Sequence, residues 1–285
     1  MASNKHIFIK GIVKSEKYKV KVILITPKPL PVRDRFSHSQ RLLNQFAQIW
    51  QQKEQLQQQR SAEQIATREG TYIQFTSAAD HDLVTKSLED LRKGIRLLNI
   101  KETPVGKNQT QVRATVYIPN GKEGHFIAKI QKYQQEETAK GQPKNAPLVN
   151  SIEDVSIALL EGLWTDNPQL IPTDTTKWCE AWLNVNTKEN QEQEQIAQFL
   201  TTLESIGIQY KNNSIVFPER AVLLVNANRE QLFELMQQSD LLAEFRAGQE
   251  PAGFWVNENR IEQQAWVDDL LQRIQILESN VKVCL

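Results

Sequence analysis

The order of strands and helices predicted between residues 177 and 246 constrains the fold of this chain more than any other feature. Polar and apolar residues alternate over 177–185, as expected for a strand with one buried face. A helix with one apolar stripe is predicted over 190–205 and ends at Gly207. The remaining segments are strands at 208–210 and 214–217, divided by Asn212-Asn213, a strand at 221–225, a helix that begins near Asn228 and a last strand at 241–248. This βαββαβ order predicts an antiparallel sheet with two helices on one face, the ferredoxin-like arrangement.

A similar order of elements is predicted over residues 70–140. Strands are expected at 71–75, 95–100 and 111–119, and helices at 80–91 and 123–137. The segment 102–108 contains Pro104 and Gly106 and is predicted to be a loop. No last strand is evident. The chain is therefore predicted to be an α+β protein with two successive ferredoxin-like units.

Three further segments complete the predicted organisation. Residues 1–69 hold a strand at 19–25 and a long amphipathic helix at about 37–66, with Leu42, Phe46 and Ile49 on its apolar stripe. Residues 141–176 connect the two units through a helix that begins at Ser151, whose spacing to Asp154 is that of a capping box. Residues 249–285 hold a linker, a C-terminal helix at 258–276 and a strand at 281–285. The predicted units are thus 70–140 and 177–248.

Composition excludes some classes of function. Lys and Arg number 34, as do Asp and Glu, so the chain lacks the basic excess that neutralises nucleic-acid phosphates. No apolar run approaches the length of a membrane-spanning helix, and residues 1–11 do not resemble a secretory signal. We therefore predict a cytoplasmic protein without a nucleic-acid or membrane partner. Its two cysteines, Cys179 and Cys284, are then expected to be buried thiols rather than a disulfide.

The sequence offers no recognisable catalytic or metal-binding set. Asp80-His81-Asp82 has no second histidine four residues on, and we interpret it as a helix N-terminus that uses aspartate for capping. His38 is close to Asp34 and Ser39 in sequence, but a triad is defined in space, and no motif supports one here. His125 and Cys179 are interpreted as packing residues. Phosphate-binding glycine motifs are absent from the sequence, so no cofactor is predicted.

Five of the tryptophans cluster in the second half of the chain. We interpret them as core and inter-domain packing residues in preference to a ligand-stacking surface. They are Trp164, Trp178, Trp182, Trp255 and Trp266.

Several sequence segments resemble the N-terminal region of a family of bacterial subtilisin-like serine peptidases. These are large cytosolic proteins often encoded beside an AAA-type ATPase. The segments are LPVRDRFSHSQRLLNQF (30–46), REGTYIQF (68–75), DLVTKSLEDLRKGIRLLNI (82–100), ATVYIPNGKEGHFIAKIQKY (114–133), NAPLVNSIEDVSIALLEGLWTD (145–166), WCEAWLNV (178–185) and QQAWVDDLLQRI (263–274). In this family a strand like VKVCL (281–285) leads into the Asp-Thr-Gly of the triad aspartate. That motif, His-Gly-Thr and Gly-Thr-Ser are all absent from this sequence.

The resemblance implies a non-catalytic region that precedes a protease domain and is inactive alone. The end of the second unit, QLFELMQQSDLLAEFRAG (231–248), is similar to the end of a subtilisin propeptide, in which an edge strand leads the chain into the protease cleft. On this reading the chain is a propeptide-like inhibitor or chaperone of the downstream catalytic domain. The candidate inhibitory tail is Phe245, Arg246, Ala247, Gly248, Gln249 and Glu250. Two alternatives remain open: an interaction module that recruits the ATPase or another partner, and a region that only completes the larger fold.

Overall fold

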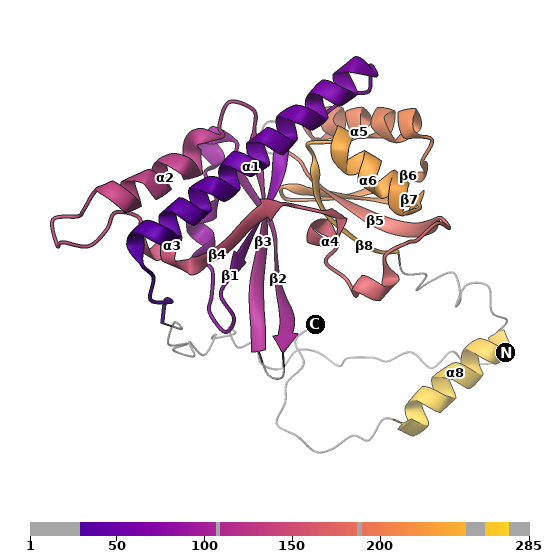
Figure 1. The fold of residues 1–285 in the computed structure, drawn as a ribbon. Coiled ribbons are helices and arrows are strands. Elements are labelled where there is room, and N and C mark those ends of the chain that lie inside the picture. Colours follow the sequence, from indigo (N-terminus) through magenta and orange to yellow (C-terminus); the bar gives the residue numbers. More distant parts are fainter. Residues whose placement is uncertain (1–28, 107–108, 187–189, 249–259, 274–285) are drawn as a thin grey trace.

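Two four-stranded antiparallel sheets form the framework of the protein. The computed structural model describes residues 29–106, 109–186, 190–248 and 260–273. The first sheet has the order β2-β3-β1-β4 and the second the order β6-β7-β5-β8 (Figure 1). The strands are β1 (Gly70–Ser77), β2 (Arg96–Gly106), β3 (Gln109–Pro119), β4 (Ile152–Ile157), β5 (Lys177–Asn184), β6 (Gln209–Phe217), β7 (Arg220–Ala227) and β8 (Leu242–Ala247). Each strand of the first sheet thus has a counterpart at the same place in the second, which confirms the predicted fold class.

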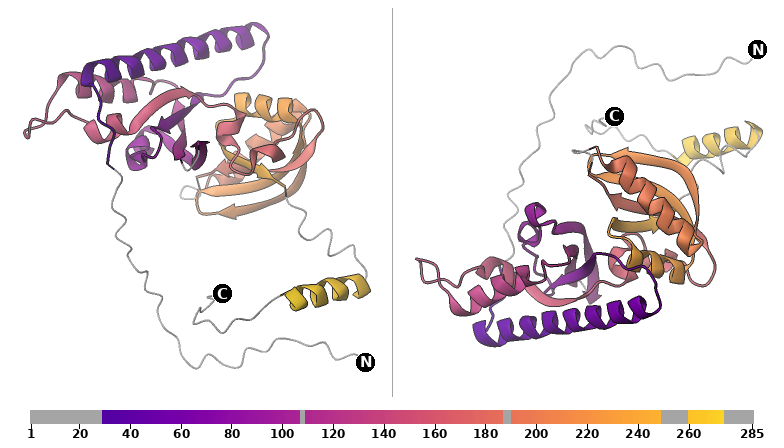
Figure 2. Two further views of the ribbon diagram at one scale, coloured as in Figure 1. Left: turned by 60° about the horizontal axis from the view of Figure 1, so that its bottom comes forward. Right: turned by 90° about the horizontal axis from the view of Figure 1, so that it is seen from above.

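The helices of each unit cover one face of its sheet. In the second unit α5 (Glu192–Ile206) and α6 (Arg229–Gln238) lie together on one side, as predicted (Figure 2). In the first unit α1 (Arg35–Ala62) and α2 (Gly124–Gln135) occupy the equivalent side. Shorter elements are α3 (Ala146–Ser151), α4 (Leu160–Leu163) and the 3₁₀ turns η1 (Thr85–Leu88), η2 (Leu91–Lys93) and η3 (Pro168–Leu170). The C-terminal helix α8 (Arg260–Arg273) lies apart from both sheets (Figure 1).

The predicted helix over 80–91 is wrong. Asp80 has a left-handed backbone, with φ of 59°, and its carboxylate accepts a hydrogen bond from the Thr110 N–H. The segment continues as an irregular stretch and the 3₁₀ turns η1 and η2. The physical reason is that α1 already fills this place: Leu42 and Phe46 of α1 pack in one core with Phe75 of β1 and Phe126 of α2. A four-stranded sheet has room for only two such helices on one face.

The predicted helix from Ser151 is also wrong, since Ile152–Ile157 is the strand β4. It pairs antiparallel with β1, with Val155 opposite Phe75. The Ser151 hydroxyl donates to the Leu148 carbonyl and does not cap a helix. The segment predicted to connect the units therefore supplies the fourth strand of the first sheet.

Two predicted breaks in strands are absent. Residues 102–106 continue β2 instead of forming a loop, with Pro104 opposite Thr110. Asn212-Asn213 lies within β6, at an irregularity in its pairing with β7, and the hairpin turns at Pro218-Glu219. The predicted strands at 19–25 and 281–285 lie outside the described residues.

The two units share a core. The face of the first sheet that α1 and α2 leave free contributes Tyr72, Leu98 and Tyr117 to the same buried cluster as Trp164 and the interior of the second unit. The Tyr72 hydroxyl donates to the Ser239 carbonyl at 2.7 Å. Because this surface is buried between the sheets, it is closed to other partners.

The side chains of buried Arg68 and half-buried Arg96 join the two units at this junction. The guanidinium of Arg68 donates to the Met236 carbonyl, at 2.6 Å, and to Oε1 of Gln237, at 2.9 Å, both at the C-terminal end of α6. Carbonyls at a helix C-terminus carry partial negative charge, which favours a cation there. Arg96 stacks over the Tyr117 ring at 4.3 Å and donates to the Asp240 carbonyl.

Candidate docking surface

The side chains of β5 and β7 divide into a buried and a half-buried set. On the side of α5 and α6, Cys179, Ala181 and Leu183 alternate along β5 with half-buried residues that point to the opposite face. β7 alternates in the same way. No α-helix among the described elements lies on that opposite face (Figure 2). The strand pairing brings together there Trp178 and Trp182 of β5, Val222 and Leu224 of β7, and Ile215 and Phe217 of β6. We call these six residues the aromatic face.

Stacking interactions hold the aromatic face in one conformation. The rings of Trp182 and Phe217 lie parallel, at an interplanar angle of 4° and a centroid distance of 6.0 Å. Ile215 and Phe217 are 61% and 45% exposed, although both are large apolar residues. Contiguous apolar side chains on a surface mark a contact site more often than isolated ones do. Aromatic residues fixed in this way bind a partner at little entropic cost.

Charged groups border the aromatic face. The guanidinium of Arg246, on β8, lies 4.3 Å from the Trp182 ring, and the ammonium of Lys211 lies 5.0 Å from the Trp178 ring. Glu180 accepts a hydrogen bond from the Trp182 indole at 2.9 Å. The Trp182 indole N–H is therefore satisfied within the face, and a partner can cover it without leaving that group unpaired.

β6 is the sheet edge that the described residues leave uncovered. The edge of β4 is covered by α1, where the Gln45 side chain accepts from the Val155 N–H. The edge of β8 is covered by the Thr165 N–H, which donates to the Phe245 carbonyl. Asn99 of β2 donates to the Ala243 carbonyl, so the edge of β2 faces the second unit. In β6 every residue except Tyr210 is exposed.

Most of the predicted inhibitory tail is part of the second sheet. Phe245 is fully buried in the core, and Arg246 and Ala247 pair with β5. The Gly248 N–H donates to the Trp178 carbonyl, and a Cβ at Gly248 would lie 2.6 Å from the same oxygen. Gln249 and Glu250 lie outside the described residues. The four described members of the set thus serve to close the sheet.

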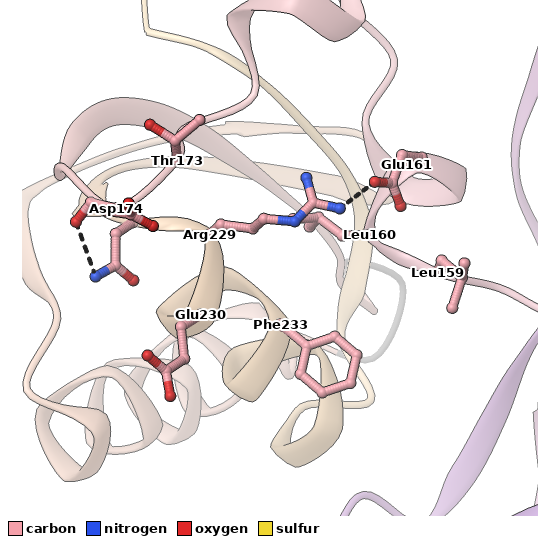
Figure 3. A pocket seen from close by; sticks show the side chains of 9 residues that line it. Leu159, Leu160, Glu161, Thr173, Asp174, Arg229, Glu230 and Phe233 are labelled. Atoms are coloured by element: carbon pink, nitrogen blue, oxygen red, sulfur yellow. Dashed lines mark hydrogen bonds and ion pairs between the residues drawn. The ribbon is translucent and has the colours of Figure 1, made fainter.

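A hollow lies between α4 and the first turn of α6 (Figure 3). It has a volume of about 480 Å³ and nine lining residues, among which Arg229 and Glu161 form an ion pair. Exposed Leu159 and Phe233 stand on one side of it. Its polar groups fasten α6 to the preceding segment, since Arg229 pairs with α4 and Asn228 donates to the Asp174 carbonyl. None of the nine residues is a histidine, serine or cysteine.

His38 and His81 serve packing and local contacts. His38 is buried, with Nε2 3.0 Å from the Val149 carbonyl and Nδ1 3.2 Å from Arg41. Burial lowers the pKa of His38. Nδ1 of His81 lies 2.7 Å from the Ala79 carbonyl, in the turn that replaces the predicted helix start. Among the residues that the structure describes, no histidine ring is hydrogen-bonded to a serine or cysteine side chain.

The Cys179 thiol is buried and faces the core. Burial raises its pKa to about 12, so the reactive thiolate is scarce at neutral pH. Within the described ranges, no group of three histidine, cysteine or acidic side chains could hold a metal ion. In the same ranges, no helix combines the length and apolar character needed to cross a bilayer.

The aromatic face was only partly visible in the sequence. Trp164 is fully buried in the shared core, as interpreted. Trp178 and Trp182 point away from that core, and the signal was their alternation with Cys179 and Ala181 along one strand. The contribution of β6 was hidden, because Asn212-Asn213 was interpreted as a turn. Trp255 and the side chain of Trp266 lie outside the described residues.

Comparison with known proteins identifies similarity in the first half of the chain. Residues 36–158 match the family model of the Y4kK N-terminal domain. The match begins one residue into α1 and ends one residue after β4. It therefore spans the first sheet together with α1, which supports the assignment of that helix to the first unit. No match was found among curated proteins.

Proposed function

We propose that the chain is the non-catalytic, propeptide-like region of a subtilisin-like serine endopeptidase, and that the aromatic face docks on the catalytic domain. The observation that carries this proposal is a ferredoxin-like sheet with helices on one side and an ordered, uncovered aromatic face on the other. Burying the exposed parts of such side chains stabilises a complex by about 25 cal/mol per Å² of apolar area. A surface of this kind binds a folded partner rather than a small molecule.

Docking through this face would inhibit the protease or assist its folding. No group of this chain would take part in a catalytic step. The sheet ends at Gly248, beside Trp178 at the border of the aromatic face. When the second unit is docked, the residues after Gly248 would therefore leave the sheet at the edge of the contact. In this proposal any substrate-like tail begins after Gly248, because Phe245 to Gly248 are held in the sheet.

The test is inhibition of the separated catalytic domain of the parent protease by the 285-residue chain. We expect proteolysis to fall as the chain is added. Ile215→Glu should weaken inhibition at least about tenfold, because it puts a charge into a desolvated contact. Ile215 is exposed, so the variant should keep its stability within about 0.5 kcal/mol.

Val216→Glu is the matched control. Val216 is the next residue of β6 and is also exposed, but it pairs with Ala221 on the opposite face of the sheet. It should inhibit like the unaltered chain. Unchanged proteolysis at saturating chain would refute the inhibitor proposal, and equal losses from both variants would refute docking through the aromatic face.

A second candidate is recruitment of an ATPase or another partner through α1. The favouring observation is its length of 28 residues with a glutamine-rich side that is exposed, including Gln51, Gln55 and Gln58. Removing residues 1–140 would leave β4 without β1, so point variants are the sounder test. Changing these three glutamines to glutamate should abolish capture of the partner and leave inhibition intact; undiminished capture would reject this role.

A further inference from the structure

A basic hollow lies beside the N-terminus of α2, remote in sequence from the aromatic face. It has a volume of about 550 Å³. Its lining includes four lysines, Lys93, Lys122, Lys129 and Lys132, together with His125. No carboxylate is among its lining residues. Two acidic groups lie next to it: Glu123, between the lining residues Lys122 and Gly124, and Asp90, whose Oδ2 lies 3.5 Å from the Lys93 ammonium and 3.9 Å from Nδ1 of His125.

The backbone adds to the positive potential of this hollow. The twelve-residue helix α2 begins at Gly124, which lines the hollow, and its N-cap Glu123 makes no side-chain capping bond. Glu123 instead pairs with Lys53 at 2.8 Å. The N–H groups of a first helical turn carry partial positive charge and bind anions. The N-terminus of α2 and the lysines therefore both favour an anionic ligand.

His125 is the second and independent sign of a ligand. Its side chain is only 6% exposed, and Nδ1 lies 3.1 Å from the Lys93 ammonium. An ammonium can only donate, so Nδ1 accepts and the ring proton lies on Nε2. Nε2 is buried and has no hydrogen-bond partner among the described residues. A buried donor without a partner costs about 1–3 kcal/mol, and an acceptor that reaches Nε2 would remove that cost.

We propose that this hollow binds the phosphate group of a small phosphorylated molecule. Phosphate oxygens are acceptors only, which matches a site built from ammonium, imidazole and backbone N–H donors. The hollow is larger than one phosphate, which leaves room for the remainder of a small ligand. This binding role is separate from the proposed docking function and uses the other unit.

Binding would change the protonation of His125. In the free protein, burial, Lys129 and Lys93 lower its pKa to about 4. Lys122, Lys132 and Asp90 are the other charged groups around it. A bound phosphate anion would counter the lysines and raise this pKa. Proton uptake would then accompany binding, so affinity should increase as the pH falls through the raised value.

The experiment is an NMR titration of the His125 ring in the full chain, with inorganic phosphate and pyrophosphate at constant ionic strength and with chloride as the reference. The ring signals are assigned with the His125→Asn variant. We expect either phosphate probe to raise the pKa of His125 by at least about one unit, and chloride to leave it near 4. Identical titration curves in chloride, phosphate and pyrophosphate would overturn the proposal.

A double variant and a control variant distinguish a specific binding site from nonspecific electrostatic attraction. Lys122→Gln with Lys132→Gln alters two exposed lysines and should weaken phosphate binding at least about tenfold. Lys177→Gln removes an exposed lysine at the start of β5, outside the hollow, and should have no effect beyond ionic screening. Equal losses in the double variant and the control would also overturn the proposal.

Discussion

Buried hydroxyls at the junction make individual tyrosines sensitive to alkaline pH. Burial raises the pKa of Tyr72 and Tyr117, and for Tyr117 the nearby carboxylate of Asp240 acts in the same direction. The folded state therefore keeps protons that the unfolded chain releases above a pH of about 10. With more protons bound in the folded state, the free energy of unfolding falls as the pH rises through this range.

We expect Tyr117→Phe to flatten this fall by up to about 1.4 kcal/mol per pH unit above pH 10, because one titrating group is removed. Phenylalanine keeps the ring over which Arg96 stacks. Urea denaturation between pH 7 and pH 11 measures the effect. The difference at pH 7 gives the cost of the lost hydroxyl contacts, and parallel curves for the two proteins would contradict the prediction.

At the scale of single elements, local signals identified the second unit well. Asn228 was recognised as an N-cap from its residue type and position, and its side chain accepts from the Gln231 N–H while the Gln231 side chain accepts from the Asn228 N–H. Gly207 ends α5 with φ of 75°, as a C-terminal glycine should. Such signals depend on neighbours in sequence, so a sequence can reveal them.

The capping box predicts a measurable cost. Asn228→Ala should lower the free energy of unfolding by about 1 kcal/mol, because the Gln231 N–H at the start of α6 loses its partner. Gln191→Ala is the control, since Gln191 occupies the N-cap of α5 without a side-chain capping bond. Chemical denaturation of both variants checks this, and a loss as large in the control would refute it.

Element predictions failed where distant residues decide the structure. Ile152 and Val155 have helical spacing, yet they form β4 because its backbone pairs with β1 and is capped by Gln45 of α1. Residues 80–91 were also predicted to form a helix, but α1 occupies that face of the sheet. In the second case a helix that precedes the first sheet takes the place of the helix expected inside the unit.

The candidate surfaces show the same limit at the scale of the whole molecule. The alternation of Trp178 and Trp182 placed them on one face of a strand, but only the sheet order shows that β6 adds Ile215 and Phe217 to it. His125 and Lys93 are 32 residues apart in sequence, and no local pattern joins them. Sites assembled from several elements depend on tertiary packing, which a single sequence does not display.

The shared core makes the two units one cooperative body, and Arg68 provides its most direct test. Arg68 is buried at the junction and joins the first strand of one sheet to the C-terminal end of α6 in the other unit. Replacing it with methionine keeps much of the side-chain volume but removes the bonds to Gly70, Met236 and Gln237. We expect Arg68→Met to lower the free energy of unfolding by about 2–4 kcal/mol.

Hydrogen exchange then distinguishes a cooperative body from two independent units. If the core is shared, slowly exchanging amides of β1 and β7 should lose protection by the same amount in Arg68→Met, because both are released by one global unfolding event. Arg92→Met, at an exposed arginine, should change stability by no more than about 0.5 kcal/mol. Loss of protection in β7 with β1 unchanged would show that the units unfold separately. If the two units unfold together, a ligand bound in the basic hollow of the first unit would also stabilise the aromatic face of the second unit against unfolding. If they unfold independently, it would not.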